Sequence, residues 1–347
     1  IELGIDTLQR VAQVGQHALL VEAWDDQRYR SPRRVCLCRE LDTADGLDVL
    51  VDHVSFGSTL AMYATGRSFL SLVPGHPSQL PVAEELYGIP ATWPSRLDPG
   101  RVEVAQLATL AARVTEAFTM RWNAALATIA PHRDPVDDAF RVHGRRVLYN
   151  SLAAHHDPAR TPELPADHRF VGPLVRDESL PDALGGWAER RDDRSQVYVG
   201  LGTFLSHRSD VLAKIVDALR AIGARAAVAV GATSIEDLGP IPHDWIVAPQ
   251  LPQVAALRHA DLAIHHGGNN TVQEALAAGA HQLVLPFSTD QFATAADLER
   301  VGAAAVLAPN DVTSDELAAA VHAQLRPARP DAKPRVNPED LVDALFA

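Results

Sequence analysis

The sequence has few cysteines and no long apolar run, and both absences restrict the class of protein. Cys36 and Cys38 are the only cysteines among 347 residues. In "RVCLC" they alternate with Leu37, so on a strand both point to one face, which fits two reduced, mostly buried thiols better than a disulfide or a metal pair. No apolar run reaches about 18 residues, the length that a membrane span needs. The sequence also shows no signal peptide, and we expect a soluble, cytoplasmic protein.

Basic residues are also scarce. Lys and Arg number 31 against 44 Asp and Glu, which gives a formal net charge of −13. A general nucleic-acid surface is therefore not expected, because phosphate backbones are bound by Lys and Arg. A small anionic ligand remains compatible with this charge if backbone N–H groups at a helix N-terminus receive it. The length predicts two domains, and with 47% hydrophobic residues each can bury a core of its own.

Strands and helices alternate in the second half of the chain. We expect strands at 196–202, 224–231, 245–249, 261–267, 282–287 and 304–309. Helices are expected at 210–223, 254–260, 270–279, 291–302 and 313–325, the last with Thr313 as its N-cap. This βαβ spacing predicts a parallel sheet with helices on both faces.

The first half has the same scheme in a less regular form. Its expected strands are 17–24, 33–38, 48–54, 69–75, 145–151 and 168–174, and its expected helices are 6–15, 57–66 and 102–129. We therefore predict an α/β chain with an N-terminal domain over 1–175, a linker rich in Pro, Gly and charge over 176–195, a C-terminal domain over 196–330, and a helical tail over 331–347 that packs back on the first domain. Open α/β sheets of this kind bind ligands at the carboxyl ends of their strands.

The run "HHGGNNTVQE" at 265–274 lies where a predicted strand ends and a predicted helix begins. Unpaired N–H groups and the helix dipole make such a turn an anion site. Gly267 and Gly268 allow close approach of the backbone to a phosphate, and His266 can donate a hydrogen bond to it. Asn270 and Thr271 can cap the helix or add donors, and one turn later Glu274 can accept from sugar hydroxyls. A plain turn explains the glycines or the cap, but not two histidines with Glu274 one turn later.

A metal site is the other specific functional interpretation of His265 and His266. Adjacent residues of a strand point to opposite faces, so these two side chains do not easily share one ion. We therefore predict no metal there.

Three further turns open at the same predicted sheet edge. "LPFSTDQF" offers Asp290 and Gln291, an acceptor-only carboxylate beside an amide, which suits the vicinal hydroxyls of a hexose; the alternative is a helix N-cap by Asp290. "VAPQLPQ" offers the Ala248 backbone and Gln250 to a nucleobase edge, or is only a Pro-containing turn. "VGLGTF" places Gly202 and Thr203 at the start of a loop, without the third glycine of a dinucleotide fingerprint.

Taken together, these turns resemble the C-terminal signature of family 1 glycosyltransferases with the GT-B fold, in which two Rossmann-like domains face each other across a cleft. The resemblance covers about residues 196–309, through "VYVGLGT", "APQLPQ" and "ADLAIHHGGNNTVQEALAAGAHQLVLPFSTDQF". It implies a nucleotide-diphosphate-sugar donor, held mostly by the C-terminal domain without a metal or other cofactor. Bacterial members more often have a small residue and Gly where Asn269 and Asn270 stand, and plant members often carry Trp near Val247.

The resemblance also implies a role for each matching residue. It assigns pyrophosphate contacts to His266, Gly268, Asn270 and Thr271, with Gly267 and Asn269 in the same turn. It places Glu274 at the ribose, as in plant members, and Asp290 with Gln291 at the donor sugar.

An inverting transferase needs a base that takes the proton of the acceptor hydroxyl. In the family this base is a His in a short "GH" loop after the first strand. The start "IELGIDTLQRV" resembles the helix that comes after that loop, so we expect the base upstream of Ile1. Asp52 matches the Asp that orients the base, and a turn-forming Asp is the alternative. His53 is a weaker candidate base, and His76 is either an acceptor contact or a surface-loop residue.

The leading hypothesis is an inverting, metal-independent glycosyltransferase. It would move a hexose or deoxyhexose from a dTDP- or UDP-sugar to a small hydrophobic natural-product acceptor, as a monomer or homodimer without a nucleic-acid partner. Two alternatives stay open: a nucleotide-sugar epimerase of the same fold, and a catalytically impaired auxiliary protein that binds nucleotide sugars.

Overall fold

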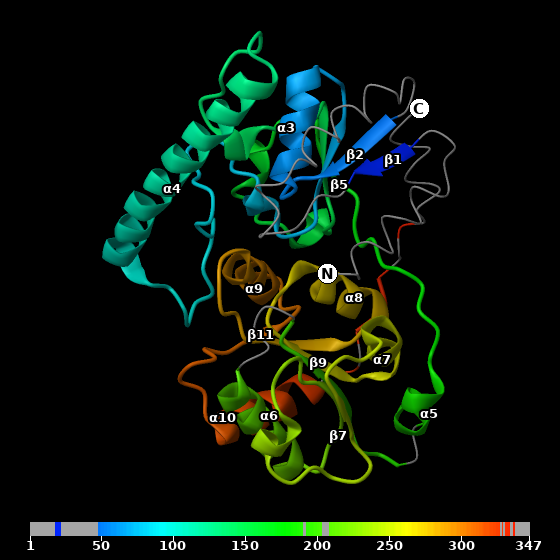
Figure 1. Ribbon diagram of the computed structural model, residues 1–347. Helices are drawn as coiled ribbons and strands as arrows, with labels where there is room; N and C mark the ends of the chain where they lie inside the picture. Colours follow the sequence, from blue (N-terminus) through cyan, green and yellow to red (C-terminus); the bar gives the residue numbers. More distant parts are fainter. Residues whose placement is uncertain are drawn as a thin grey trace. The chain divides into compact units, whose positions relative to one another are not determined.

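The computed structural model describes residues 18–21, 48–189, 192–202, 208–326, 328, 330–333 and 336. The chain forms two compact units, each with its own parallel β-sheet (Figure 1). Unit 1 contains residues 92–98 and 175–335, and unit 2 contains residues 2–91, 99–174 and 336–347. The expected elements at 6–15 and 33–38 and both cysteines lie outside the described residues.

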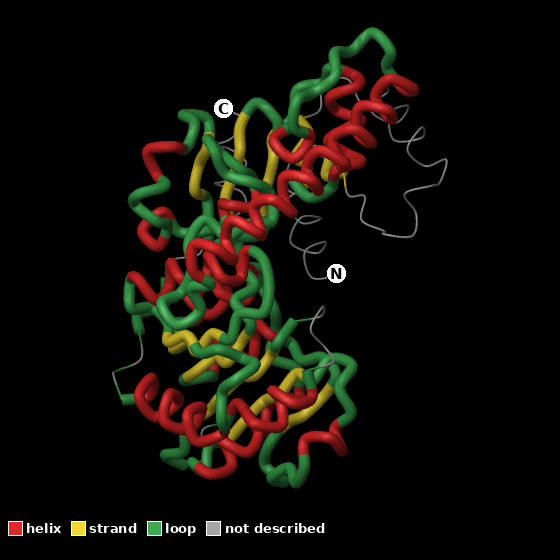
Figure 2. Tube along the Cα trace, turned by 90° about the vertical axis from the view of Figure 1, so that its left-hand side faces the viewer, coloured by secondary structure: helices red, strands yellow, loops and turns green. Residues whose placement is uncertain are grey.

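Unit 2 is built on five parallel strands in the order β1-β2-β3-β4-β5, which Figure 2 shows in yellow. The strands are β1 (Ala18–Val21), β2 (Asp48–Asp52), β3 (Leu70–Val73), β4 (Arg146–Tyr149) and β5 (His168–Phe170). The helices are α3 (Phe56–Thr65) and the 30-residue α4 (Gly100–Ile129), with 3-10 turns η1 (Pro77–Gln79), η2 (Ala139–Arg141), η3 (Ala153–His155) and η4 (Thr161–Glu163).

Alternate residues of β2 face opposite sides of this sheet. Val49 and Val51 pack with Ala61 and Met62 of α3, whereas Leu50 packs with leucines of β3 and β4. Burial of apolar surface on both faces stabilises the unit and fixes the register of its strands.

Unit 1 is a doubly wound sheet of six parallel strands in the order β11-β10-β9-β6-β7-β8. The strands are β6 (Gln196–Gly200), β7 (Arg225–Ala229), β8 (Ile246–Ala248), β9 (Leu262–His265), β10 (His281–Val284) and β11 (Ala305–Val306). The helices are α5 (Asp182–Ala188), α6 (Ser209–Ala221), α7 (Gln253–His259), α8 (Asn269–Ala278), α9 (Asp290–Arg300) and α10 (Ser314–Leu325), with one further 3-10 turn, η5 (Ile235–Leu238).

Helices cover both faces of the unit 1 sheet. Val197 and Val199 of β6 join the core with α6 and α10, and Tyr198 between them joins the core with α5 and α7. The last helix begins with a capping box in which Thr313 accepts from the Glu316 N–H, so the N-cap expected at Thr313 is confirmed.

The path of the chain creates a switch point in unit 1. From β6 it runs outward through β7 and β8, then crosses to β9, β10 and β11 on the other side of β6. Gly200 of β6 and His265 of β9 are register partners at the carboxyl ends of these two strands. In doubly wound sheets this is the place where ligands bind.

The expected linker over 176–195 differs from the structure. Its central part forms α5, whose Leu184 and Trp187 are buried in the core of unit 1. Proline, glycine and charge indicated a linker, but burial of a tryptophan anchors the stretch to the sheet. From the expected C-terminal tail, Val336 packs against the Leu50 cluster of unit 2, and residues 337–347 lie outside the described part of the chain.

Within the described residues, no helix is both long enough and apolar enough to cross a membrane.

Candidate functional site

The imidazole of His266 occupies the switch point of unit 1. It lies between two glycines: a Cβ on Gly202 would be 2.7 Å from its Cε1, and a Cβ on Gly268 would be 2.4 Å from its Nε2. Neither position accepts a larger side chain without moving the ring. The backbones after β6 and β9 therefore pack directly against His266, which holds the ring in place at the mouth of the switch point.

His266 has hydrogen-bonding capacity left over. Its Nδ1 is buried and has no hydrogen-bond partner among the described residues, while the ring makes a hydrogen bond with the Gly200 backbone. Burial lowers the pKa of His266 to about 4, against the opposing effects of the nearby Asp290 carboxylate and of the Gly200 backbone. The imidazole is therefore neutral near pH 7 and carries a single N–H, which donates to the Gly200 backbone or, in the Nδ1–H tautomer, to an anion.

His265 has a structural role. It is fully buried, its Nδ1 accepts from the Gly267 N–H at 3.1 Å, and its Nε2 lies 3.0 Å from Gln282 Oε1. Both ring nitrogens are thus engaged within the protein.

Helix α8 begins at Asn269, with Gly268 as an N-cap that has no side chain to offer the helix. Asn269 is buried and accepts from Gln273, whereas Asn270 is exposed. Thr271 lies within the helix and accepts from Gln253 Nε2 at 3.1 Å, so it does not cap. The helix therefore begins without a side-chain cap, and Asn269 and Asn270 differ in role.

Glu274 belongs to a buried polar network that motif reasoning missed. Its Oε1 accepts from Arg176 Nη1 at 3.2 Å, and its Oε2 accepts a short hydrogen bond from Gln253. Gln253 Oε1 in turn accepts from Tyr198 at 2.8 Å. Burial is the largest influence on Glu274 and raises its pKa. An ionised carboxylate offers about four lone-pair sites, so Glu274 can still accept a hydrogen bond from a ribose hydroxyl.

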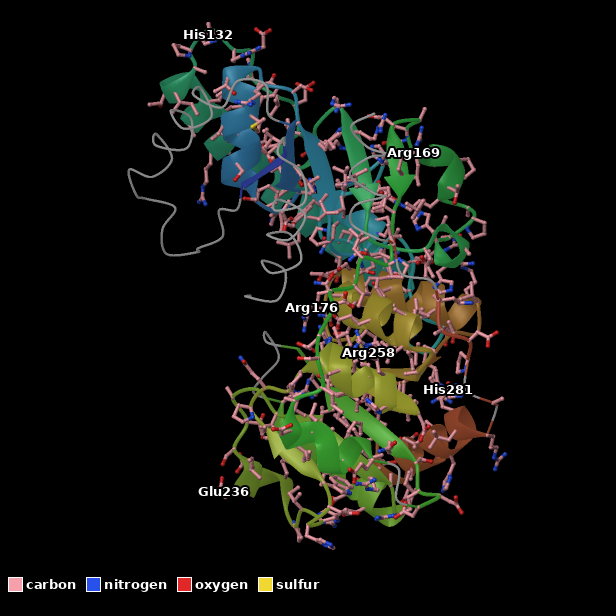
Figure 3. The ribbon with its side chains drawn as sticks, turned by 90° about the vertical axis from the view of Figure 1, so that its right-hand side faces the viewer. His132, Arg169, Arg176, Glu236, Arg258 and His281 are labelled. Atoms are coloured by element: carbon pink, nitrogen blue, oxygen red, sulfur yellow. The ribbon has the colours of Figure 1, made fainter. Side chains whose placement is uncertain are left out.

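Arg176 links this network to Glu178, on the segment of unit 1 that precedes α5. Arg176 Nη2 lies 3.0 Å from Glu178 Oε1, and Arg258 donates to the Glu178 backbone at 2.9 Å; both arginines are labelled in Figure 3. Gln253 stands at the end of "VAPQLPQ", but nothing in the sequence singled out Arg176, because its partner lies 98 residues away.

The turn after β10 adjoins the turn after β9. A Cβ on Gly267 would lie 3.3 Å from the Gln291 carbonyl oxygen, and Asp290 acts electrostatically on His266. Asp290 is the first residue of α9, and the N-cap is Thr289, so the N-cap interpretation of Asp290 is wrong. Thr289 has φ +43°, a left-handed conformation that is costly for a β-branched residue.

Gln291 uses part of its amide within this turn. Its Oε1 accepts from the Phe287 N–H at 2.9 Å and from the Ser288 N–H at 3.2 Å. These bonds shape the strained turn. Because they occupy Oε1, a sugar contact of Gln291 would have to use its amide nitrogen.

The remaining predicted residues of unit 1 are less informative. The Ala248 carbonyl accepts from Val230, and Gln250 is exposed beyond the end of β8. Strands β8 and β9 are three strand spacings apart in the sheet, about 14 Å. Thr203 lies outside the described residues.

The predicted residues of unit 2 lie at the carboxyl edge of its own sheet. Asp52 ends β2, and its Oδ1 accepts from the Val54 N–H at 3.0 Å. This bond is the one expected of a turn-forming Asp, the alternative interpretation of Asp52. His53 is buried, with Nε2 3.3 Å from the Gln79 carbonyl, and burial lowers its pKa to about 4.

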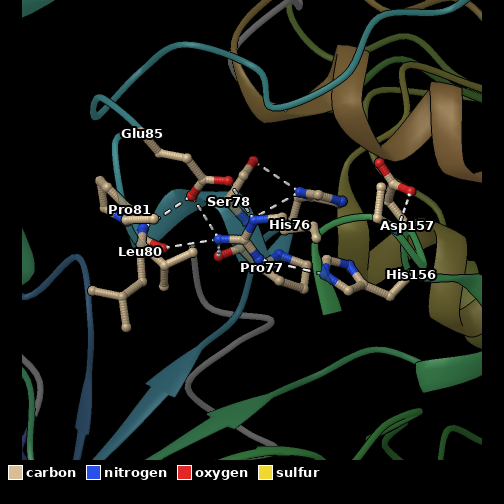
Figure 4. Close-up of polar contacts among 12 residues, drawn as sticks. His76, Pro77, Ser78, Leu80, Pro81, Glu85, His156 and Asp157 are labelled. Carbon is tan, nitrogen blue, oxygen red and sulfur yellow. Dashed lines mark hydrogen bonds and ion pairs between the residues drawn. The ribbon is translucent and has the colours of Figure 1, made fainter. Parts of the chain in front are cut away.

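His76 is not a freestanding surface-loop residue. Its Nδ1 accepts from the Ser78 N–H at 3.1 Å and so caps η1 (Figure 4). Arg160 holds the same turn: it pairs with Glu85 at 2.6 Å and donates to the Leu80 carbonyl at 3.2 Å. The loop after β3 is thus fixed by buried polar contacts, which loop composition did not reveal.

Comparisons with known proteins relate part of the chain to bacterial glycosyltransferases. Residues 213–340 match the family described as erythromycin biosynthesis protein CIII-like, C-terminal domain. Demethyllactenocin mycarosyltransferase of Streptomyces fradiae is 32% identical over 151 residues, which is 43% of this chain and 32% of that protein. NDP-glycosyltransferase YjiC of Bacillus subtilis (strain 168) is 31% identical over 155 residues, 44% of this chain and 39% of that protein. The chain thus aligns with about a third of the length of these relatives.

Solved structures show the same fold over most of the chain. The glycotransferase of kitacinnamycin superposes with a TM-score of 0.69 at 17% identity, covering 94% of this chain and 87% of that one. Spinosyn rhamnosyltransferase SpnG gives 0.63 at 17% identity, covering 99% and 80%. The fold is therefore GT-B. In sequence, part of the chain is similar to bacterial glycosyltransferases.

Proposed function

We propose that this protein is an inverting glycosyltransferase that moves a hexose or deoxyhexose from a dTDP- or UDP-sugar to a small hydrophobic natural-product acceptor. No metal or other cofactor takes part in the proposed reaction. The proposal concerns donor, acceptor and catalysis, and each part is supported by a different region of the structure.

The observation that carries the proposal is the half-buried His266, whose Nδ1 atom is buried and has no partner among the described residues. It stands at the switch point of a doubly wound sheet, beside the N-terminus of α8. Several buried polar atoms of the described residues have no partner, but this one lies beside a helix N-terminus, where a bound anion would explain it. A diphosphate at this position would accept from helix N–H groups and, in its Nδ1–H tautomer, from the neutral imidazole.

The same arrangement favours departure of a nucleoside diphosphate. Negative charge grows on the leaving pyrophosphate as the glycosidic bond to the sugar breaks. Helix N–H groups at the start of α8, together with an N–H of His266, would stabilise that charge. We place the donor sugar near Asp290 and Gln291, because their turn adjoins that of His266.

The nucleotide class is supported by structural neighbours. Glycosyltransferase VinC was solved in complex with DTDP and superposes with a TM-score of 0.60 at 18% identity, covering 90% of this chain and 74% of that one. SpnG was also solved with thymidine diphosphate.

Aromatic side chains of unit 2 support a hydrophobic acceptor. Phe56 begins α3 just after β2, and its ring centroid lies 4.9 Å from Phe118 and 5.4 Å from Phe140. Tyr87 stacks on Phe140 at 3.8 Å. Phe56, Tyr87 and Phe118 are only partly buried, so this cluster offers aromatic surface near the carboxyl edge where Asp52 lies.

Calorimetry with dTDP and UDP tests the donor part. His266→Ala should weaken binding by about 10- to 150-fold, the effect of losing about 1.5–3 kcal/mol from a hydrogen bond to a charged group. His322→Ala, an exposed histidine on α10, is the matched control and should bind like the wild type. Unchanged affinity of His266→Ala for both nucleotides would refute the assignment.

Release of dTDP or UDP from the sugar donor, measured with and without a panel of hydrophobic hydroxylated acceptors, tests catalysis. Acceptor-dependent release with inversion at the anomeric carbon supports the proposal. Tight nucleotide binding without release, across the panel, would favour the auxiliary-protein alternative.

A further inference from the structure

Three metal-ligating side chains meet at the amino edge of the unit 2 sheet. His143, Asp167 and His168 each offer a ligand atom, and these atoms lie within 4.8 Å of one another. His143 precedes β4, Asp167 precedes β5 and His168 begins it; Arg169, the next residue, is labelled in Figure 3. Parallel strands β4 and β5 are neighbours, so their amino ends bring the three together.

His168 is the buried member of this cluster. It is 7% exposed, and its Nδ1 lies 2.6 Å from the Tyr149 hydroxyl. Its Nε2 is buried and has no hydrogen-bond partner within the described part of the chain. Whichever tautomer is present, one lone pair or N–H of this ring is left unsatisfied among the described residues and is available to a ligand.

His143 has the orientation of a metal-binding histidine. Its Nδ1 donates to the Gly144 carbonyl at 2.8 Å, which directs the lone pair to Nε2. The His143 and His168 rings meet edge to face, with centroids 5.4 Å apart. Both δ nitrogens therefore have partners within the protein, and both ε nitrogens are left for a shared ion.

We propose that His143, Asp167 and His168 bind a divalent cation of the zinc type. Two imidazoles and a carboxylate are ligands that Zn²⁺ accepts, and water completes four-coordination. Bonds of about 2.0–2.1 Å in a tetrahedral site place ligand atoms about 3.4 Å apart. His143 and Asp167 are only partly buried, so small side-chain rotations close the remaining gap to His168.

The cluster is distinct from the residues assigned to the proposed reaction, although His143 and His168 act electrostatically on His53. It lies at the amino edge of its sheet, whereas Asp52 lies at the carboxyl edge and the nucleotide residues belong to unit 1. A cation here joins the segment before β4 to the start of β5. We therefore infer a stabilising site that holds unit 2 together, not a catalytic metal.

Cobalt titration of the full chain, free of any affinity tag and stripped with a chelator, tests the site. The wild type should bind one equivalent of Co²⁺, with the visible absorption bands of four-coordinate cobalt that Zn²⁺ removes. Zn²⁺ should raise the unfolding temperature, since a ligand that binds only the folded state stabilises it. Asp167→Asn and His143→Gln should each abolish the bands and the thermal shift.

Two further variants complete the test. His132→Gln changes an exposed histidine of the same unit outside the cluster and should leave binding unchanged. Tyr149→Phe removes the partner of His168 Nδ1 and should weaken binding about 10- to 100-fold with unchanged stoichiometry. Circular dichroism confirms folding of each variant. Absence of the cobalt bands in the wild type, or bands that survive in both Asp167→Asn and His143→Gln, would overturn the proposal.

Discussion

A side-chain carbon on Gly202 would lie 2.7 Å from Cε1 of His266. Gly202 also has φ +77°, a left-handed conformation that glycine adopts freely. Two independent constraints, close approach and backbone conformation, thus require glycine at this position. The first constraint exists only because the His266 ring occupies the switch point, so it connects Gly202 to the proposed diphosphate site.

Gly202→Ala should displace the imidazole of His266 and weaken nucleotide binding by at least 10-fold. Its left-handed backbone should also cost about 1–2 kcal/mol of stability. Gly223→Ala is the matched control: φ is +69°, but no atom of the described residues lies within 4 Å of the added carbon. Calorimetry with dTDP and denaturant unfolding separate the two effects. Equal affinities in the two variants would show that the position of the ring does not matter for binding.

The sequence predicted the helices and strands of unit 1 closely because their periodicity is strong. The expected helix at 210–223 is observed as Ser209–Ala221, and the expected strand at 261–267 as Leu262–His265. Parallel strands that are buried on both faces appear in the sequence as short apolar runs. The regular alternation of these runs with amphipathic segments shows that the runs are strands and not helices. The switch point was not predictable, because strand order depends on pairings between distant segments.

Site residues were predictable where a turn contains side chains that can bind a ligand. The "HHGG" turn led to His266, but the distinct roles of Asn269 and Asn270 depend on which helix face each occupies. Arg176 and Tyr198 escaped prediction for another reason. They reach Glu274 and Gln253 through tertiary contacts, and neither has a motif of its own.

Glu274→Ala should lower the free energy of unfolding by about 3–5 kcal/mol. The substitution removes one of the two carboxylates that pair with Arg176. The Arg176 side chain is only 8% exposed, so its charge is poorly compensated by solvent. Asp217→Ala breaks the exposed pair with Arg220, where side-chain exposures are 52% and 32%, and should change stability by about 0–1 kcal/mol. Urea unfolding of both variants checks the contrast. Similar small losses would show that the buried network contributes little.

Asp290→Ala should reduce turnover of the sugar donor while binding of the free nucleoside diphosphate changes little. Asp290 lies in the first turn of α9, next to the turn of His266, where we place the sugar hydroxyls. Asp315→Ala removes an acid from the first turn of α10 and controls for the loss of a favourable helix-dipole contact. Donor hydrolysis and calorimetry measure the two quantities. Parallel losses in both would place Asp290 at the nucleotide instead.

Stability should decrease as the pH falls from about 6.5 toward 4. Burial lowers the pKa of His265 to about 3, so the unfolded chain takes up a proton in this range that the folded chain does not. The loss from His265 amounts to about 3 kcal/mol at pH 4. His265→Asn should reduce the pH dependence of urea unfolding, although it lowers stability at pH 7. The exposed His322→Asn should retain the full dependence, and an unaltered slope in His265→Asn would contradict the assignment.

Asp52→Asn should retain the fold and reduce turnover. Asparagine can accept from the Val54 N–H as the aspartate does at 3.0 Å, so the turn after β2 is preserved. Only the negative charge is lost, and with it the ability to orient a basic imidazole and stabilise its protonated form. General-base assistance is worth about 10²–10⁴-fold in rate, and we expect a sizeable part of that factor to disappear with nucleotide affinity unchanged.

Asp52→Ala separates the two roles of the same side chain. It removes the turn contact as well as the charge, so it should lose about 1 kcal/mol of stability that Asp52→Asn keeps. A catalytic role predicts similarly low turnover in both variants but a stability loss only in Asp52→Ala. Full activity of Asp52→Asn would leave Asp52 as a turn residue. The search for the base would then move to His53 and His76, whose rings face the η1 turn at the same sheet edge.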